Sequence, residues 1–552
     1  MIRRLLPLLA FAILSTLALA DEKSDWDTLR KNDAPLPSRM QAARLIAERV
    51  KNDSASGKVV TDFVDLGTKA NTPPELKTAL SDAISLCNNP DAGKALAKHV
   101  GQGQPAERGW ILRSARGIAT SPDLDKAIMA KGLTDEDLKN RQDAVQLLVD
   151  HKYTAAIPAF EGVLKAGKDT ELMGPIVGGI SEMLTGGPQW ADWETRLVTY
   201  ARDKNDATRR AALAALSKTK NVSYLDLFIE SLASTDWSTR ALCVAFLEKT
   251  TSKKGLGAII DQMKKEPPGT RMNAECYGAL ERLSGMKFGD KAEDWATWWK
   301  NSEATFEFPK NSGAAKTEGK RPKGYESGTS VAQFYGIEIE SKRVCFVIDI
   351  SGSMNEAVAD TSAGGGSRFD VAKRELNKII DELPPGSLFN IVTFSTDVET
   401  WLERIGDLPK GVGTKGGAKK GPSTGGKKDD KKDEKEKDDK QKAKEAEEAK
   451  KLDEALRAKA HEYVNRLAAN GGTNIYDALE AAFEDPEVDT IFFLTDGQPN
   501  FGREIDPTMI REAVQRWNET RKIKINTISI GTDFDLLKWI AADNGGDHKF
   551  FE

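Results

Sequence analysis

Two carboxylates and three hydroxyls stand in three short motifs that could together hold a metal ion. Asp349, Ser351 and Ser353 form the pattern D-x-S-x-S, Thr473 lies in Gly-Gly-Thr-Asn, and Asp496 lies in Thr-Asp-Gly. These are all hard oxygen donors, with no histidine or cysteine among them, and such a set suits Mg²⁺ or Mn²⁺ rather than zinc. Because the set supplies only two formal negative charges and leaves a coordination position open, a bound dication would accept the carboxylate of an incoming Asp or Glu.

The first and third motifs each follow a continuous apolar run, residues 342–349 and 489–496, that ends in an acid. Such runs are typical of central parallel strands that are buried on both faces. Further strands alternate with amphipathic helices from residue 368 to the end of the chain. This alternation predicts a doubly wound, Rossmann-like α/β parallel sheet, whose functional loops lie at the carboxyl ends of the strands. The expected helices are 368–383, 458–467, 475–483, 507–521 and 534–542, and the expected further strands are 388–394, 398–402, 524–531 and 548–552.

In this order, the three motifs resemble the metal-ion-dependent adhesion site of the von Willebrand factor type A family, and the resemblance covers residues 342–552. It implies that Ser351, Ser353 and Thr473 are hydroxyl ligands of the ion. It also implies that Asp349 and Asp496 approach the ion directly or through water.

Two segments depart from the pattern of this family. The loop after Met354 is lengthened by residues 355–367, and an insertion occupies residues 409–451. Every residue from 429 to 440 is charged and the signs alternate, so this stretch forms neither a core nor a strong field of one sign. We expect a solvated, largely disordered excursion with a projecting helix over residues 442–459; a regulatory or partner-binding arm is the alternative.

Residues 21–300 show short amphipathic helices separated by Gly, Pro and Asp. Two stretches, 206–219 and 236–250, each begin with an Asp as the expected N-cap, carry an Arg in the first turns and continue with an Ala/Leu-rich face. They resemble the HEAT-repeat family, which implies an all-α solenoid; an irregular helical bundle is the alternative. We expect the tryptophans at 295, 298 and 299 to cover the last open core face, and residues 301–341 to form a linker.

Residues 1–20 have the layout of a signal peptide, with Arg3 and Arg4 before an apolar run and Ala18-Leu-Ala20 at the expected cleavage site. Cleavage would give an exported protein, periplasmic, cell-surface or secreted, without stable membrane insertion; an uncleaved anchor is the alternative. The 552-residue chain holds 80 basic and 85 acidic side chains, which offers no overall field for nucleic acid. Its four cysteines lack C-x-x-C spacing, and we expect Cys345 to be a buried thiol.

The sequence therefore predicts an exported, non-catalytic adhesion-type protein that captures an acidic side chain of a protein ligand through Mg²⁺ or Mn²⁺. Its four histidines belong to no nucleophile or zinc motif, Ser351-Gly-Ser353 lacks the context of a nucleophile elbow, and no P-loop occurs. The main alternative is a metal-independent structural scaffold of the cell envelope. An enzyme that uses the ion as a Lewis acid is a third possibility, but it lacks a candidate general base.

Overall fold

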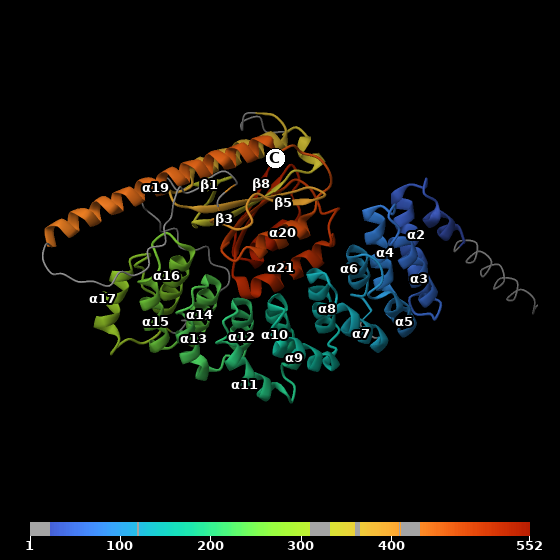
Figure 1. The fold of residues 1–552 in the computed structure, drawn as a ribbon, viewed down its shortest axis with the longest axis horizontal. Coiled ribbons are helices and arrows are strands. Elements are labelled where there is room, and N and C mark those ends of the chain that lie inside the picture. The colour runs from blue at the N-terminus through green and yellow to red at the C-terminus, as the bar shows by residue number, and fades with distance from the viewer. Residues whose placement is uncertain (1–22, 119–120, 310–331, 359–364, 408, 410–430) are drawn as a thin grey trace, which may run out of the picture. The chain divides into compact units, whose positions relative to one another are not determined.

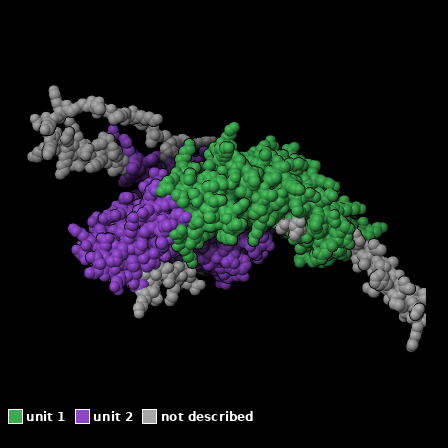
Figure 2. Space-filling model, turned by 90° about the horizontal axis from the view of Figure 1, so that it is seen from below, with its two compact units in different colours: residues 1–221 green, residues 222–552 purple. Residues whose placement is uncertain are grey.

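The structure is a computed structural model that describes residues 23–118, 121–309, 332–358, 365–407, 409 and 431–552 (Figure 1). The predicted signal peptide, most of the predicted linker and residues 410–430 of the insertion lie outside the described residues. The chain divides into two compact units, residues 1–221 and 222–552, which are coloured separately in Figure 2. The predicted domain limits at residues 300 and 342 stay a prediction. No helix among the described residues is both long and apolar enough to cross a bilayer.

The described part of the first unit is helical, and its helices pack on their second neighbours along the chain. α2 packs on α4, α4 on α6, α6 on α8, α8 on α10 and α10 on α12, while α3 packs on α5 and α5 on α7. This pattern is that of stacked helix pairs in a solenoid. The bounds are α2 Leu36–Val50, α3 Ser56–Gly67, α4 Pro74–Leu86, α5 Pro90–His99, α6 Pro105–Ser114, α7 Pro122–Ala127, α8 Leu138–Asp150, α9 Ile157–Ala166, α10 Thr170–Leu184, α11 Trp190–Tyr200 and α12 Asp206–Lys218.

Arginines in the first turns of successive repeats make the same two kinds of contact. Arg108 donates to the Gly103 carbonyl in the preceding loop at 2.8 Å and to Asp135 of the next repeat at 2.7 Å. Arg141 repeats this with the Asp135 carbonyl and with Asp169, at 2.8 and 2.9 Å. Each arginine therefore closes its own loop and ties one repeat to the following one. Arg240, in the stretch 236–250, makes the same two contacts with the Ser234 carbonyl and with Glu266, at 2.8 and 2.7 Å.

The second unit begins with five more helices: α13 Leu225–Ser231, α14 Trp237–Thr250, α15 Lys253–Met263, α16 Arg271–Ser284 and α17 Ala292–Ser302. Asp236 caps α14 as expected, but the cap of α12 is Asn205, because its side chain accepts from the Thr208 N–H while Asp206 is already helical. Trp295 and Trp299 are buried at the end of this series, and the Trp298 ring contacts Trp295 edge-on and Trp299 at a tilt.

The sheet of the second unit has the order β5-β4-β3-β6-β7-β8. β3, β4, β6, β7 and β8 are parallel, whereas the edge strand β5 runs antiparallel to β4. The sequence pattern predicts a parallel sheet throughout, but the three residues between β4 and β5 are too few for a crossover and permit only a hairpin. The bounds are β3 Arg343–Asp349, β4 Leu388–Phe394, β5 Val398–Thr400, β6 Thr490–Thr495, β7 Lys524–Ile530 and β8 His548–Phe551, with a small hairpin of β1 Gln333–Phe334 and β2 Ile337–Glu338.

Helices cover both faces of this sheet. α18 Arg368–Glu382 and α19 Lys431–Arg466 pack together over one face, where Phe346, Leu376 and Val464 share one core. α20 Ile475–Glu484, α21 Pro507–Arg521 and α22 Asp535–Asp543 lie over the other face. α19 is one unbroken helix that extends well past the sheet in Figure 1, longer than the helices expected over 442–459 and 458–467.

Within the second unit, the start of α14 packs against the end of the sheet domain where β6 begins. The indole N–H of Trp237 donates to the Pro486 carbonyl at 3.3 Å, and the buried Ser238 hydroxyl donates to the Arg521 carbonyl at 3.0 Å. α14 therefore contacts α21, away from the carboxyl ends of the strands.

Candidate metal centre at the strand-end loops

The two motif carboxylates lie at the same edge of the sheet because their strands are neighbours. β3 pairs in parallel with β6, with Ile348 opposite Leu494. Asp349 is the last residue of β3 and Asp496 directly follows β6. Both side chains are buried, so the strand register alone brings two acids together in an environment that disfavours charge.

Asp349 is held by hydrogen bonds to both of its oxygens. Oδ1 accepts from the Ser351 N–H at 2.7 Å, and Oδ2 accepts from the Thr495 hydroxyl at 2.5 Å. Burial raises the pKa of Asp349 to about 7, although these hydrogen bonds lower it, and the nearby charge of Asp496 adds to the increase. The carboxylate is therefore fixed in place by two uncharged donors.

The serine hydroxyls connect the first motif to the third. Ser351 Oγ lies 3.0 Å from Ser353 Oγ, and Ser353 Oγ donates to Asp496 Oδ1 at 2.7 Å. A Cβ built at Gly497 would lie 3.5 Å from Thr473 Oγ1 and 3.8 Å from Ser353 Oγ. The structure thus brings all five predicted site residues to one place, while their role as metal ligands stays a prediction.

The loop that carries Thr473 is fixed from two sides. The Thr473 N–H donates to Asn500 Oδ1 at 2.7 Å, and the N–H groups of Asn500 and Phe501 donate to the Thr473 carbonyl at 3.1 and 3.2 Å. On the other side, the Gly472 N–H donates to Thr396 Oγ1 at 3.0 Å. Gly472 must be glycine, since a Cβ there would lie 2.0 Å from a ring carbon of Phe501.

Three residues of this site lie outside the positions that the motifs predict. Thr495 holds Asp349, Asn500 holds Thr473, and Arg368 at the first turn of α18 donates to Asp496 Oδ2 at 2.9 Å. Thr495 could have been found from its place beside Asp496 at the end of the strand. Nothing in the local sequence around Arg368 or Asn500 indicates their partners, which lie more than twenty residues away.

The donor set fits a hard divalent cation. The five motif side chains offer carboxylate and hydroxyl oxygens only, and two buried acids within one cluster are stabilised by a positive charge. Mg²⁺ or Mn²⁺ is the natural ion for such donors, whereas zinc would favour nitrogen or sulfur.

The histidines and cysteines take no part in this cluster. His151 pairs with Asp125 at 2.6 Å, His461 contacts Asp381 at 2.8 Å, and His548 contacts Asp533 at 3.1 Å. All four cysteines are buried free thiols, as expected for Cys345. The three histidines with these partners and the four cysteines therefore contribute to packing and ion pairs away from the strand-end loops.

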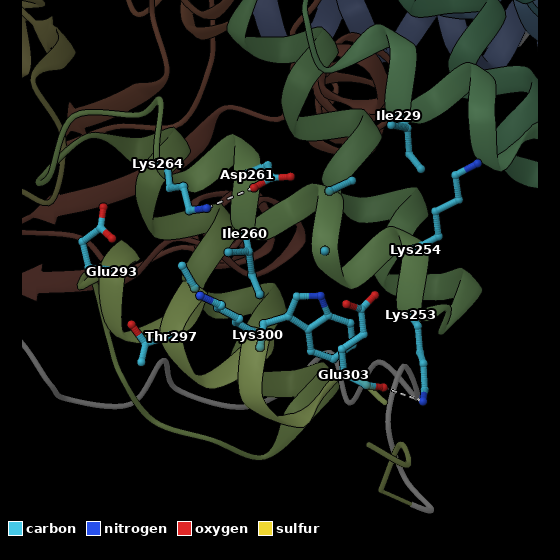
Figure 3. Close-up of a pocket in the computed structure, with 14 residues that line it drawn as sticks. Ile229, Lys253, Lys254, Ile260, Asp261, Lys264, Glu293, Thr297, Lys300 and Glu303 are labelled. Atoms are coloured by element: carbon cyan, nitrogen blue, oxygen red, sulfur yellow. Dashed lines mark hydrogen bonds and ion pairs between the residues drawn. The ribbon is translucent and has the colours of Figure 1, made fainter. Parts of the chain in front are cut away.

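A hollow of about 730 Å³ lies elsewhere in the second unit, between α15 and α17 (Figure 3). Two of the lysines that line it are engaged: Lys253 donates to the Glu303 carbonyl at 2.7 Å and Lys264 pairs with Asp261 at 3.2 Å. This hollow belongs to the helical series and shares no residue with the strand-end loops.

Comparison with known proteins supports the assignment of the sheet domain. Residues 344–411 and 441–550 match family models of the von Willebrand factor type A domain. The chain is 29% identical over 222 residues to "Inter alpha-trypsin inhibitor, heavy chain 4" of Mus musculus, covering 37% of this chain and 17% of that protein. It is 30% identical over 197 residues to "von Willebrand factor A domain-containing protein 3B" of Homo sapiens, covering 35% of this chain and 11% of that protein.

The chain thus spans less than a fifth of the length of either relative. A solved structure, "von Willebrand factor type A from Catenulispora acidiphila", aligns with a TM-score of 0.26 and 20% identity over 39% of this chain and 40% of that one. The two family matches flank residues 412–440, within the predicted insertion. The C-terminal part of this chain is therefore a von Willebrand factor type A domain, and it follows an all-helical, repeat-like region.

Proposed function

We propose that the type A domain captures a protein ligand by binding an Asp or Glu carboxylate of that ligand through Mg²⁺ or Mn²⁺. The single observation that carries the proposal is the convergence of the three motif loops. Ser353 links Ser351 at 3.0 Å to Asp496 at 2.7 Å, and Thr473 lies beside the same point. We further propose that the protein is exported, on the basis of residues 1–20, and that it has no nucleic-acid partner.

Each of the five motif residues would have a defined role at the ion. The hydroxyls of Ser351, Ser353 and Thr473 would be direct ligands, and Asp349 and Asp496 would bind the ion directly or orient its waters. When bound, the ion supplies a Lewis-acidic position for the incoming carboxylate. Because the chain contributes only two carboxylates, the ion would retain net positive charge, which favours an acidic rather than a neutral ligand.

A binding role is favoured over catalysis by the way the site is built. Thr495, Ser351 and Ser353 hold the two carboxylates, so neither acid is poised as a general base. The type A domain itself supports a protein-binding role. The non-catalytic assignment remains part of the proposal.

Calorimetric titration of the full chain with Mg²⁺ tests the metal site. We expect the wild type to bind Mg²⁺, and Asp349→Ala and Thr473→Ala to bind at least tenfold more weakly while keeping their circular dichroism spectra. The matched control is Asp381→Asn, which removes an exposed carboxylate on α18 that pairs with His461. Equal Mg²⁺ affinity in the wild type and Asp349→Ala would refute the metal assignment.

Ligand capture is tested with the immobilised protein in Mg²⁺ and in EDTA. A captured protein should be released by EDTA, and replacing one of its Asp or Glu residues with the amide should abolish binding. Capture that is identical in EDTA and in Asp349→Ala would contradict the proposal.

One observation favours the second candidate, a metal-independent scaffold. Asp349 and Asp496 already have hydrogen-bond partners within the protein, in Thr495 and Arg368. A melting temperature and partner binding that do not respond to EDTA would support this scaffold role instead.

A further inference from the structure

Arg368 is a partly buried cation in direct contact with the candidate metal centre. Its Nη1 donates to Asp496 Oδ2 at 2.9 Å and pairs with Glu356 Oε2 at 2.9 Å. The Asp496 side chain is completely buried, the Arg368 side chain is 14% exposed, and the Glu356 side chain is 64% exposed. The stronger of the two ion pairs is therefore the one with Asp496, since exposed pairs contribute little.

The guanidinium group is placed by the backbone around it. The Arg368 N–H donates to the Glu356 carbonyl at 2.9 Å, which ties the start of α18 to the loop after the first motif. A Cβ built at Gly531 would lie 2.5 Å from Cζ, Nε and Nη2 of Arg368, so the guanidinium rests directly against this glycine. Gly531 also has a φ of +73°, a conformation that favours glycine. The contact between Arg368 and Asp496 is thus built into the fold.

The two oxygens of Asp496 have separate partners. Oδ2 faces Arg368, while Oδ1 accepts from Ser353, a proposed hydroxyl ligand. A buried carboxylate requires a positive charge or strong hydrogen bonds, and Arg368 supplies that charge from within the chain. A divalent ion beside Asp496 would repel the guanidinium, and Glu356 offers the arginine a second carboxylate.

We propose that Arg368 is a built-in counter-cation of Asp496, which keeps the site folded without a metal ion and lowers the affinity of the site for that ion. This inference rests on the proposed metal-dependent function. It makes Arg368 a positioning residue for the site. It also accounts for the hydrogen bonds within the protein that would otherwise favour a metal-independent scaffold. The same residues stabilise the site both with and without the metal ion.

The test compares Arg368→Gln with the wild type in EDTA and in Mg²⁺. Glutamine keeps a hydrogen-bond donor but removes the charge. We expect a lower melting temperature in EDTA, recovery in Mg²⁺, and Mg²⁺ affinity that is roughly tenfold higher, because a like charge beside the ion is gone. Gly531→Ala should also enlarge the rise in melting temperature that Mg²⁺ gives over EDTA, because its methyl group displaces the guanidinium.

Arg374→Gln is the matched control, because Arg374 lies on the same helix and donates to the Gly365 carbonyl at 2.8 Å. If Arg368→Gln lowers the melting temperature equally in EDTA and Mg²⁺ and leaves Mg²⁺ affinity unchanged or weaker, Arg368 is merely structural and the inference is wrong.

A double-mutant cycle of Arg368→Gln and Asp496→Asn in EDTA separates this inference from the proposed function. We expect clear coupling between the two substitutions. Zero coupling overturns the inference even when the wild type binds Mg²⁺. Failure of the wild type to bind Mg²⁺ overturns the proposed function and, with it, the part of the inference that concerns ion affinity.

Discussion

Asp489, directly before β6, should make the stability of the protein depend on pH. Its buried carboxyl Oδ1 accepts from the Ser341 hydroxyl at 2.5 Å and from the Thr490 hydroxyl at 2.9 Å. Burial raises the pKa of Asp489 from 3.8 to about 6, although Ser341 and Arg271 act to lower it. The folded protein therefore holds a proton on this group more tightly than the unfolded chain does.

The sign and size follow from linkage. A folded pKa above the unfolded pKa gives a stabilisation that is complete below about pH 4 and is lost as the pH rises through about 6. A shift of about two units at 1.36 kcal/mol per unit corresponds to roughly 3 kcal/mol. Asp489→Asn keeps an acceptor oxygen for both hydroxyls and removes the ionisation. As the pH rises from 4 to 8, the free energy of unfolding of the wild type should therefore fall by roughly 3 kcal/mol relative to that of this variant.

Urea unfolding of both proteins at a series of pH values measures this difference. The unfolded fraction is followed by brief proteolysis, which cuts β6 only in unfolded chains. Other carboxyl groups contribute equally to both proteins and cancel in the comparison. Glu487→Gln is the control, because the Glu487 side chain is 47% exposed and its removal should leave the profile unchanged. If the wild type and Asp489→Asn show parallel profiles, Asp489 titrates as an ordinary surface acid and the reasoning fails.

Two further predictions test the packing around the site and within the solenoid. Gly472→Ala should destabilise the sheet domain by about 1–3 kcal/mol, because the new methyl group overlaps Phe501, and calorimetry should show Mg²⁺ binding at least tenfold weaker. The control is Gly178→Ala, which should do neither because the space around its missing Cβ is open. Arg108→Ala should lower the unfolding free energy of the helical repeats by roughly 3 kcal/mol in a urea titration, since the nearly buried Asp135 loses its partner. An unchanged urea midpoint would show that this pair contributes no stability.

Much of the sheet domain follows from local patterns in the sequence. Apolar runs such as residues 343–349 can be satisfied only between two layers, and helices must alternate with them to provide those layers. The three motifs could be placed at one edge because parallel strands all end on the same side. The expected strands and helices therefore agree closely with those observed, except where a short connection turns β5 antiparallel and where α19 runs unbroken over Lys431–Arg466.

The helical region was less determined by its sequence. The recurring Arg and the Ala/Leu faces indicate repeats, but the partner of each arginine lies in the next repeat, as for Arg108 and Asp135. Nor did the sequence indicate that Trp237 and Ser238 contact the end of the sheet domain, because an apolar residue at a helix start does not reveal what it packs against.

The sequence by itself determined which atoms could bind a cation, since residue types fix the donors and strand order fixes the edge at which they gather. Only the tertiary structure decided how those donors are held. Arg368 reaches Asp496 across 128 residues of chain, and Asn500 reaches Thr473 across 27. Such contacts arise from packing between segments that are distant in the sequence. There a buried charge is stabilised by a partner that a local sequence pattern does not indicate.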